Sequence, residues 1–182
     1  MKKLLLGIAA VCLAGFTFAQ DAPLWMRHSV ISPDGTTIAF TYKGDIYTVP
    51  VAGGRAMQIT TNPAYDTAPV WSPDSKRIAF ASDRMGSLDV YIVAKDGGEP
   101  RRLTTHSGSE TPLAFTDAGH VLFSAGIMPS AEAVVFPSNG QFNQVYRVSV
   151  EGGRPTMISS MPMECISINK EGAMLYQDKK GY

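Results

Sequence analysis

Three histidines, and the serines close to one of them, are the residues of this sequence whose types could support catalysis or metal binding. His28, His106 and His120 lie far apart, and the sequence has no H-E-x-x-H, G-x-S-x-G, Walker or paired-cysteine motif. Ser107 and Ser109 flank a glycine close to His106, a composition typical of a loop, and no third group suggests a triad. We therefore predict no catalytic residue, no metal site and no cofactor in this chain.

Two aspartates, Asp34 and Asp74, are the best candidates for an acid–base or metal-binding role, because each follows a proline in the same short motif. The motif reads S-P-D-G over 32–35 and S-P-D-S over 72–75. It is also the composition of a β-turn, in which proline presets φ and aspartate bonds its own backbone. We favour the turn, because Asp117 in the third copy, T-D-A-G, is displaced by one position.

Four markers recur in the same order along the chain, and this turn is the first of them. A large apolar residue precedes each turn: Ile31, Trp71, Phe115 and Ile168. An aromatic residue ends the second apolar run: Phe40, Phe80, Phe123 and Tyr176. A tyrosine marks the third run: Tyr47, Tyr91 and Tyr146. Glycines suited to tight hairpins come next, so the predicted turn residues are Pro33, Asp34, Gly35, Pro73, Asp74, Gly53, Gly54, Gly97, Gly98, Gly152 and Gly153.

These markers predict an all-β protein built from four-stranded antiparallel sheets. The units repeat every 40 to 55 residues or so, roughly the spacing of β-propeller blades. One such sheet cannot bury both of its faces, whereas sheets stacked around an axis cover one another. A β-sandwich of hairpins is the alternative, but a sandwich does not require the same turn sequence in every unit.

We predict about three and a half blades, an incomplete propeller from the N-terminal part of a longer protein. The predicted domain spans residues 20–182. The propeller is predicted to be incomplete because the fourth unit contains only its first two strands. The predicted blade boundaries are 24–61, 66–105 and 110–160, with the start of a fourth blade at 164–182.

Residues 1–19 have the composition of a signal peptide. Lys2 and Lys3 precede a short apolar run that ends in small residues, which predicts cleavage at Ala19–Gln20 and a periplasmic or secreted protein. An uncleaved anchor is the alternative, although the run is short for a span of about 20 residues. A lipid-attachment site at Cys12 is disfavoured, because the apolar run continues past it.

The composition excludes some classes of partner. Sixteen basic residues balance sixteen acidic ones without a long run of either sign, so we predict no nucleic-acid partner. We also predict no membrane association once the leader is cleaved. Cleavage would leave Cys165 as the one cysteine, which excludes an internal disulfide and favours a small buried apolar side chain.

One face of the predicted propeller varies much more than the other. The first and third turns of each unit share a face and hardly change, whereas the second connection lengthens from unit to unit and is longest at Ile127–Asn143. Long loops on a rigid scaffold often carry binding residues, so we predict a face that contacts peptides or a partner domain through Met128, Phe136 and Phe142. An insertion that packs on itself or is disordered remains the alternative.

The motif S-P-D-G…I-A-F…G-D-I-Y-T-V…G-G…Q-I-T over 32–60 resembles the repeat of TolB-like propellers, and the resemblance covers residues 24–182. It is more similar still to the propeller that begins tricorn-type serine peptidases, because the first blade follows the leader without an intervening α/β domain. The loop sequence A-V-V-F-P-S-N-G-Q over 133–141 also resembles that subgroup.

The resemblance implies a non-catalytic domain that gates or channels peptides toward a serine-peptidase core. Its implied partners are a PDZ domain and a peptidase core further along the same polypeptide, peptides, and in some cases further copies of the chain. The family's catalytic residues would lie beyond Tyr182. A TolB-like periplasmic scaffold, or the propeller of another hydrolase such as a prolyl oligopeptidase or an amidohydrolase, is the alternative function.

Overall fold

Strands and turns make up the part of the chain that the structure describes. The computed structural model describes residues 25–126, 143–161, 163–169 and 171–178, and no helix occurs among them. Within these ranges, therefore, no helix is long and apolar enough to cross a membrane. Consecutive strands pair antiparallel in four separate sheets, which we call blades 1 to 4.

Blades 1 to 3 each contain four strands in chain order, and blade 4 contains two. Blade 1 consists of β1 (Arg27–Ile31), β2 (Thr37–Tyr42), β3 (Asp45–Pro50) and β4 (Met57–Gln58). Blade 2 consists of β5 (Asp66–Trp71), β6 (Arg77–Ser82), β7 (Asp89–Ala94) and β8 (Arg101–Arg102). Blade 3 consists of β9 (Glu110–Asp117), β10 (His120–Ala125), β11 (Gln144–Ser149) and β12 (Thr156–Ser159). Blade 4 consists of β13 (Met163–Ile168) and β14 (Met174–Asp178).

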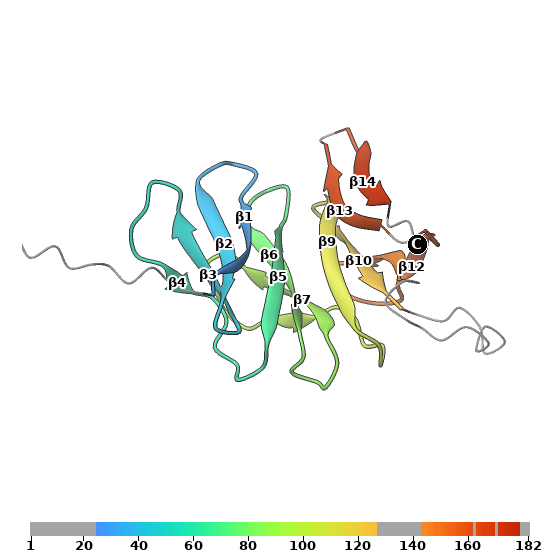
Figure 1. Cartoon of the computed structure of the whole chain (residues 1–182), viewed down its shortest axis with the longest axis horizontal. Helices are drawn as coiled ribbons and strands as arrows, with labels where there is room; N and C mark the ends of the chain where they lie inside the picture. The colour runs from blue at the N-terminus through green and yellow to red at the C-terminus, as the bar shows by residue number, and fades with distance from the viewer. Residues whose placement is uncertain (1–24, 127–142, 162, 170, 179–182) are drawn as a thin grey trace, which may run out of the picture.

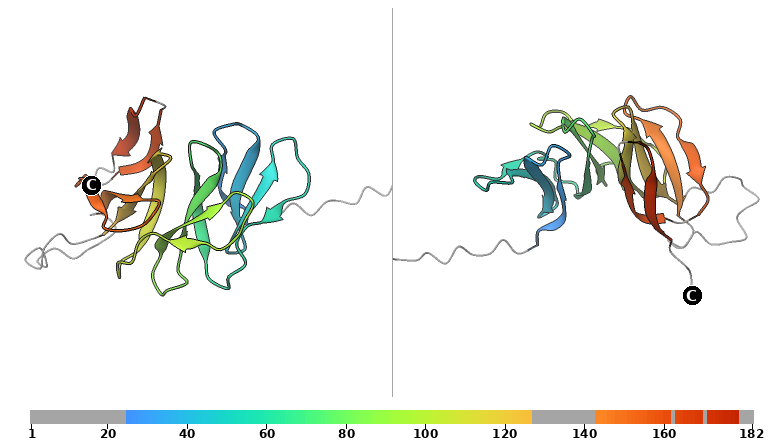
Figure 2. Two further views of the ribbon diagram at one scale, coloured as in Figure 1. Left: turned by 180° about the vertical axis from the view of Figure 1, so that it is seen from behind. Right: turned by 90° about the horizontal axis from the view of Figure 1, so that it is seen from above.

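The blades fan out around a common axis, with their first strands innermost. Strand β1 contacts β5, β5 contacts β9, and β9 contacts β13, whereas β4 lies at the outer edge of blade 1 (Figure 1). Seen from behind and from above, the sheets form an open fan that does not close into a ring (Figure 2). The structure confirms the predicted incomplete propeller of about three and a half blades, and it does not form a sandwich.

The first turn of each complete blade is held by short polar contacts. In blade 1 the Ser32 hydroxyl donates to Asp34 Oδ1 at 2.5 Å, and the Thr36 N–H donates to the same oxygen at 3.0 Å. Gly35 follows with φ of 72°. The Ser32 hydrogen bond is the main reason that the pKa of Asp34 lies below its ordinary value. Asp34 is therefore engaged in turn formation in this structure.

Blade 2 uses the same turn with one exchange that links it to blade 1. Ser75 occupies the position of Gly35 and keeps the left-handed conformation, with φ of 56°, which is strained for a residue with a side chain. Its hydroxyl accepts a hydrogen bond from the N–H of Asp34 at 3.1 Å. The hydroxyl thus joins the first turns of adjacent blades.

In blades 2 and 3, residues of the second strand alternate between the two neighbouring blades, because side chains alternate along a strand. In β6, Ile78 and Phe80 pack against blade 1, whereas Ala79 packs against blade 3. We call the side of a blade that faces the preceding blade its front, and the opposite side its back. The front of blade 2 carries the stacked rings of Phe80 and Tyr91, with centroids 6.0 Å apart. Equivalent stacked pairs lie on the other complete blades: Phe40–Tyr47 and Phe123–Tyr146.

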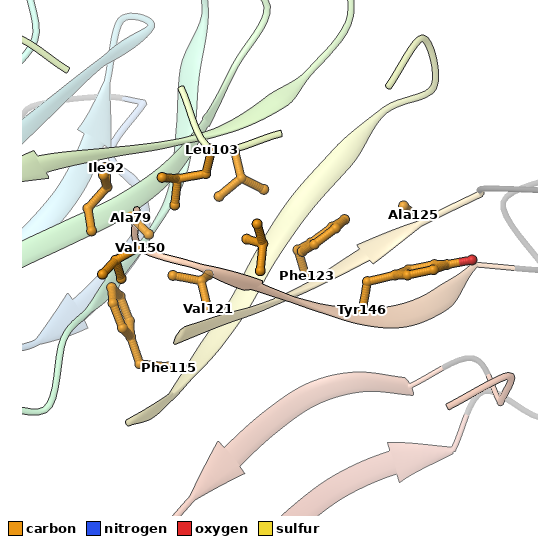
Figure 3. Close-up of a cluster of buried hydrophobic side chains, with 11 residues drawn as sticks. Ala79, Ile92, Leu103, Phe115, Val121, Phe123, Ala125, Tyr146 and Val150 are labelled. Carbon is orange, nitrogen blue, oxygen red and sulfur yellow. The ribbon is translucent and has the colours of Figure 1, made fainter. Parts of the chain in front are cut away.

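Apolar clusters fill the spaces between the complete blades. In the cluster between blades 2 and 3, the aromatic pair on the front of blade 3 meets smaller side chains on the back of blade 2 (Figure 3). Its buried members are Ala79, Val90, Ile92, Leu103, Phe115, Val121, Phe123, Ala125, Tyr146, Val148 and Val150. The cluster between blades 1 and 2 contains Ala39, Ile46, Ile59, Trp71, Ile78, Phe80, Tyr91 and Val93. Burial of each large apolar side chain contributes about 1.5–3 kcal/mol, so these clusters hold the fan together.

The two ends of the fan differ from its middle. Ile31 on blade 1 is 58% exposed, whereas Trp71 at the equivalent position of blade 2 is 8% exposed. On the back of blade 4, Leu175 is 76% exposed, although the equivalent Ala79 and Leu122 are fully buried. Among the described residues, the front of blade 1 and the back of blade 4 therefore lack the covering that the inner faces have.

Replacing Phe80 with alanine should test the packing between blades 1 and 2. We expect Phe80→Ala to lower the free energy of unfolding by about 3–5 kcal/mol, because the ring is fully buried and its removal leaves a cavity. Urea denaturation followed by circular dichroism measures the change. Leu175→Ala is the matched control and should change stability by no more than about 0.5 kcal/mol. Equal effects of the two substitutions would contradict this assignment of the core.

Candidate functional site

An apolar cavity of about 710 Å³ opens where the four innermost strands end at their first turns. We call it the axial cavity, because every blade contributes to its wall. The large apolar residues that precede the first turns form much of the lining: Ile31, Trp71, Phe115 and Ile168. The volume falls in the range of small-molecule and cofactor sites, which are mostly apolar with a few polar groups.

Contacts between adjacent inner strands position this lining. The indole N–H of Trp71 donates to the carbonyl of Val30 at 3.2 Å, which fixes the ring of blade 2 against blade 1. Near the opposite ends of these strands, the Thr67 hydroxyl lies 3.1 Å from Nδ1 of His28. His28 and Ala68 both have φ of 51°, within irregularities of β1 and β5 that interrupt the pairing register. The same backbone irregularity therefore recurs at equivalent positions of both strands.

Asp117 supplies the charge at the rim of the axial cavity. Burial opposes its ionisation, but hydrogen bonds from His120 and from the N–H of Gly119 outweigh burial and hold its pKa below the ordinary value. The N–H of Gly119 donates to Asp117 Oδ1 at 2.6 Å, and Nδ1 of His120 lies 3.1 Å from both carboxylate oxygens. The carboxylate thus stays ionised and bound, so the cavity offers apolar contact with a negatively charged rim.

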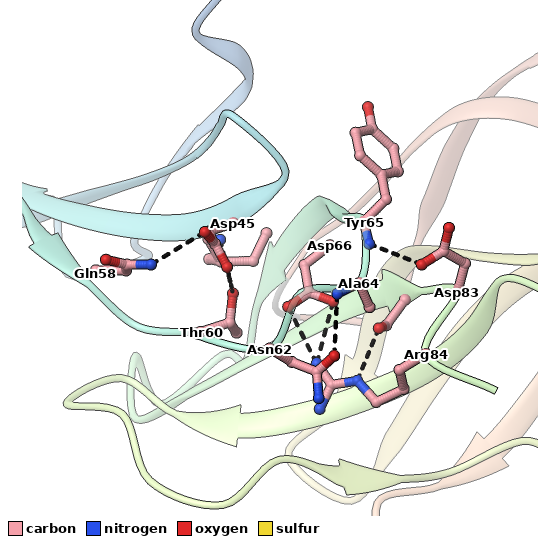
Figure 4. Close-up of polar contacts among 11 residues, drawn as sticks. Asp45, Gln58, Thr60, Asn62, Ala64, Tyr65, Asp66, Asp83 and Arg84 are labelled. Atoms are coloured by element: carbon pink, nitrogen blue, oxygen red, sulfur yellow. Dashed lines mark hydrogen bonds and ion pairs between the residues drawn. The ribbon is translucent and has the colours of Figure 1, made fainter.

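Ion pairs lie at the opposite ends of the inner strands, where one blade connects to the next. We call the polar contacts around Asp66 junction 1–2 (Figure 4). Arg84 donates from Nη2 to both carboxylate oxygens of Asp66 at 3.1 Å and from Nε to Ser82 at 2.8 Å. The guanidinium also lies 4.5 Å from the ring centroid of Tyr91, a cation–π distance. Arg84 therefore neutralises the buried acid and packs on the aromatic pair of its own blade.

The equivalent region between blades 2 and 3, which we call junction 2–3, has a different set of partners. Asp89 and Glu110 are fully buried there. Arg102 Nη2 lies 2.8 Å from Asp89 Oδ2, and the Thr104 hydroxyl donates to Glu110 Oε2 at 2.5 Å. Burial raises the pKa of Glu110 to about 7.

The residues predicted from sequence are distributed over several places. The three histidines do not meet: His28 contacts Thr67, His106 accepts a hydrogen bond from the N–H of Gly108 at 3.0 Å, and His120 pairs with Asp117. The predicted partner-face residues Met128, Phe136 and Phe142 lie outside the described residues, as does the side chain of Cys165. The described residues contain no group of three or more His, Cys, Asp or Glu placed to hold a metal ion.

Sequence reasoning missed the axial cavity and the two junctions as possible sites. A signal for the cavity is present, because a large apolar residue recurs before each first turn, but by itself this recurrence indicates only a repeat. The junctions also had a signal: Asp45 and Asp89 begin the third strands, and Asp66 and Glu110 begin the next blades.

Known proteins with similar sequences include propeller domains and peptidases. The model of the tricorn protease N-terminal beta propeller domain matches residues 23–181. Tricorn protease homolog 1 of Streptomyces coelicolor is 35% identical over 102 residues, which cover 56% of this chain and 9% of that protein. Uncharacterized peptidase YuxL of Bacillus subtilis is 30% identical over 129 residues, which cover 70% of this chain and 20% of that protein.

Among solved structures, the putative TolB from Agrobacterium tumefaciens is similar with a TM-score of 0.65 and 26% identity, covering 83% of this chain and 53% of that chain. The parts of the chain that match the Streptomyces coelicolor and Bacillus subtilis proteins correspond to a fifth or less of the length of those proteins. The match to the domain model extends over nearly the whole sequence. The chain belongs to the family of tricorn protease N-terminal β-propeller domains.

Proposed function

We propose that this chain is the non-catalytic propeller of an exported, tricorn-like serine peptidase and that it guides peptides toward a peptidase core. The observation that carries the proposal is the axial cavity, an apolar recess to which all four blades contribute. An extended peptide would place apolar side chains against the exposed part of this lining, which includes Ile31. No covalent chemistry is required of the chain in this role.

Three further features support this proposal. Two of the similar proteins are a tricorn protease homolog and a peptidase, and both are much longer than this chain. A PDZ domain and a peptidase core are the proposed partners within the same polypeptide. The apolar leader at residues 1–19 favours export to the periplasm or outside the cell.

A TolB-like scaffold is the second candidate, and the similarity to the putative TolB structure favours it. In that role the same cavity would hold a segment of another envelope protein. The sequence of the longer protein separates the two proposals: a peptidase core supports the first, and six blades without such a core support the second.

Peptide hydrolysis tests the non-catalytic assignment. We expect the purified chain to leave casein and fluorogenic peptides uncleaved, because the described histidines and serines do not form a nucleophilic site. Release of fluorophore measures the activity, and a serine peptidase serves as the positive control. Turnover that copurifies with the chain and disappears after His106→Ala would overturn the assignment.

Tryptophan fluorescence tests peptide binding in the axial cavity. Trp25 is 68% exposed, so Trp25→Phe leaves Trp71 as the single reporter at the cavity wall. We expect apolar peptides to shift its emission with a saturable dependence on concentration. The matched variant Trp71→Phe, which retains Trp25, should show no saturable shift. A response in the second variant alone would exclude the cavity as the binding place.

The long connection of unit three gives a separate prediction for the full-length protein. We expect deletion of Ile127–Asn143 to slow the cleavage of long peptides and to leave the cleavage of dipeptide esters unchanged. The reason is that the loop would control the access of long substrates to the peptidase core and not the chemical step. Steady-state kinetics with both substrate classes measures the effect. Unchanged rates for both classes would remove the loop from the proposed function.

A further inference from the structure

Junction 1–2 and junction 2–3 have the same backbone framework. The N–H of Ile46 donates to Thr60 Oγ1 at 3.0 Å, and the N–H of Val90 donates to Thr104 Oγ1 at 2.9 Å. Two further backbone bonds are also repeated: Ile59 N to Ile46 O and Asp66 N to Gly44 O correspond to Leu103 N to Val90 O and Glu110 N to Leu88 O. The two junctions can therefore be compared position by position.

The side chains that complete this framework differ in one respect. At junction 1–2, Arg84 binds both carboxylate oxygens of Asp66. Arg84 stands four residues after Phe80, and the residue four after the equivalent Phe123 is Ile127. Glu110, the counterpart of Asp66, therefore has no arginine from its own blade at that position.

Three of the four carboxyl oxygens at junction 2–3 lack a hydrogen-bond donor among the described residues. Neither oxygen of Asp89 has an aligned hydrogen-bond donor among the described residues, and the same holds for Oε1 of Glu110. At junction 1–2, Asp45 accepts hydrogen bonds from Gln58 at 3.0 Å and from Thr60 at 3.3 Å. A buried polar atom without a partner costs about 1–3 kcal/mol, so the unmatched oxygens at junction 2–3 require an explanation.

Few charged or titratable groups lie close to Glu110. Asp89 approaches from β7, Arg102 from β8, and His106 from the preceding loop with Nδ1 3.9 Å from Glu110 Oε1. On β10, Ala125 lies opposite Glu110 in the register, and on β5 the nearest acid, Asp66, is paired with Arg84. One guanidinium thus faces two buried carboxyl groups.

We propose that junction 2–3 is a proton-dependent joint, in which the protonated carboxyl group of Glu110 donates a hydrogen bond to the Asp89 carboxylate and takes the place of the arginine found at junction 1–2. The proton supplies the donor that the Asp89 carboxylate lacks and removes one of two neighbouring negative charges. Loss of the proton leaves two ionised carboxylates between blades 2 and 3 with one arginine, and the joint loosens. The proposal does not depend on the proposed function.

The raised pKa of Glu110 determines how the stability of the joint depends on pH. Burial raises the pKa of Glu110 from 4.5 to about 7, so the folded joint holds a proton that the opened joint releases. The joint is tightest at low pH, and its stability falls as pH rises through this interval. For these two values, linkage predicts that the protection of the joint falls about tenfold between pH 6 and pH 8.

Residue-resolved hydrogen exchange of the 182-residue chain, with rates divided by the intrinsic rate at each pH, reads both junctions in one experiment. We expect about a tenfold loss of protection for the amides of Val90, Leu103 and Glu110 between pH 6 and pH 8. The matched amides of junction 1–2 should keep constant protection: Ile46, Ile59 and Asp66. Equal changes at both junctions would overturn the proposal.

Two variants and one direct titration complete the test. Glu110→Gln should keep the hydrogen bond to Asp89 and remove the pH dependence, whereas the exposed control Glu151→Gln should retain it. Histidines commonly gain a proton in this pH range, so His106→Asn should also retain the dependence if Glu110 is the sensor. In the unmodified chain, the carboxyl carbon of Glu110 should titrate near pH 7. A midpoint near the ordinary value of 4.5, or loss of the dependence in His106→Asn, would refute the proposal.

Discussion

No blade of this protein can cover its own faces, and the rest of the structure depends on this constraint. A four-stranded meander satisfies its backbone hydrogen bonds between its strands, yet it leaves apolar side chains on both sides. Phe80 and Ala79 are adjacent in β6 and are both fully buried, because one meets blade 1 and the other meets blade 3. Stability therefore belongs to the interfaces between blades, as in other repeat proteins whose units contact only their neighbours.

The turns, the strand order and the blade spacing could be predicted because they depend on local sequence. Proline, aspartate and glycine impose turn geometry within a few residues, and the positive φ of Gly53 and Gly97 agrees with their place in the hairpins. The fan also followed from the recurrence of those turns. Ser75 shows the limit of local reasoning, since its turn position favours glycine, whereas its hydroxyl accepts a hydrogen bond from a residue of another blade.

The axial cavity and the two junctions could not be derived in the same way, because they form between segments that are distant in sequence. Trp71 and Phe115 are 44 positions apart in the sequence, and nothing in either segment indicates that both line the axial cavity. Likewise, Asp66 and Glu110 begin equivalent strands, but only their partners distinguish them. A neutralising arginine at one and a hydroxyl at the other change the electrostatics within an unchanged backbone framework.

The order of faces along the chain has a consequence for synthesis. A ribosome makes the N-terminal segments first, so the back of each blade is complete before the aromatic pair that will cover it has emerged. Phe80 and Tyr91 can dock on a finished blade 1, and Phe123 and Tyr146 on a finished blade 2. Growth of the fan is thus templated in one direction, with every newcomer arriving at a prepared surface. The front of blade 1 is the exception: Phe40 and Tyr47 are made first, yet none of the described blades packs on that face.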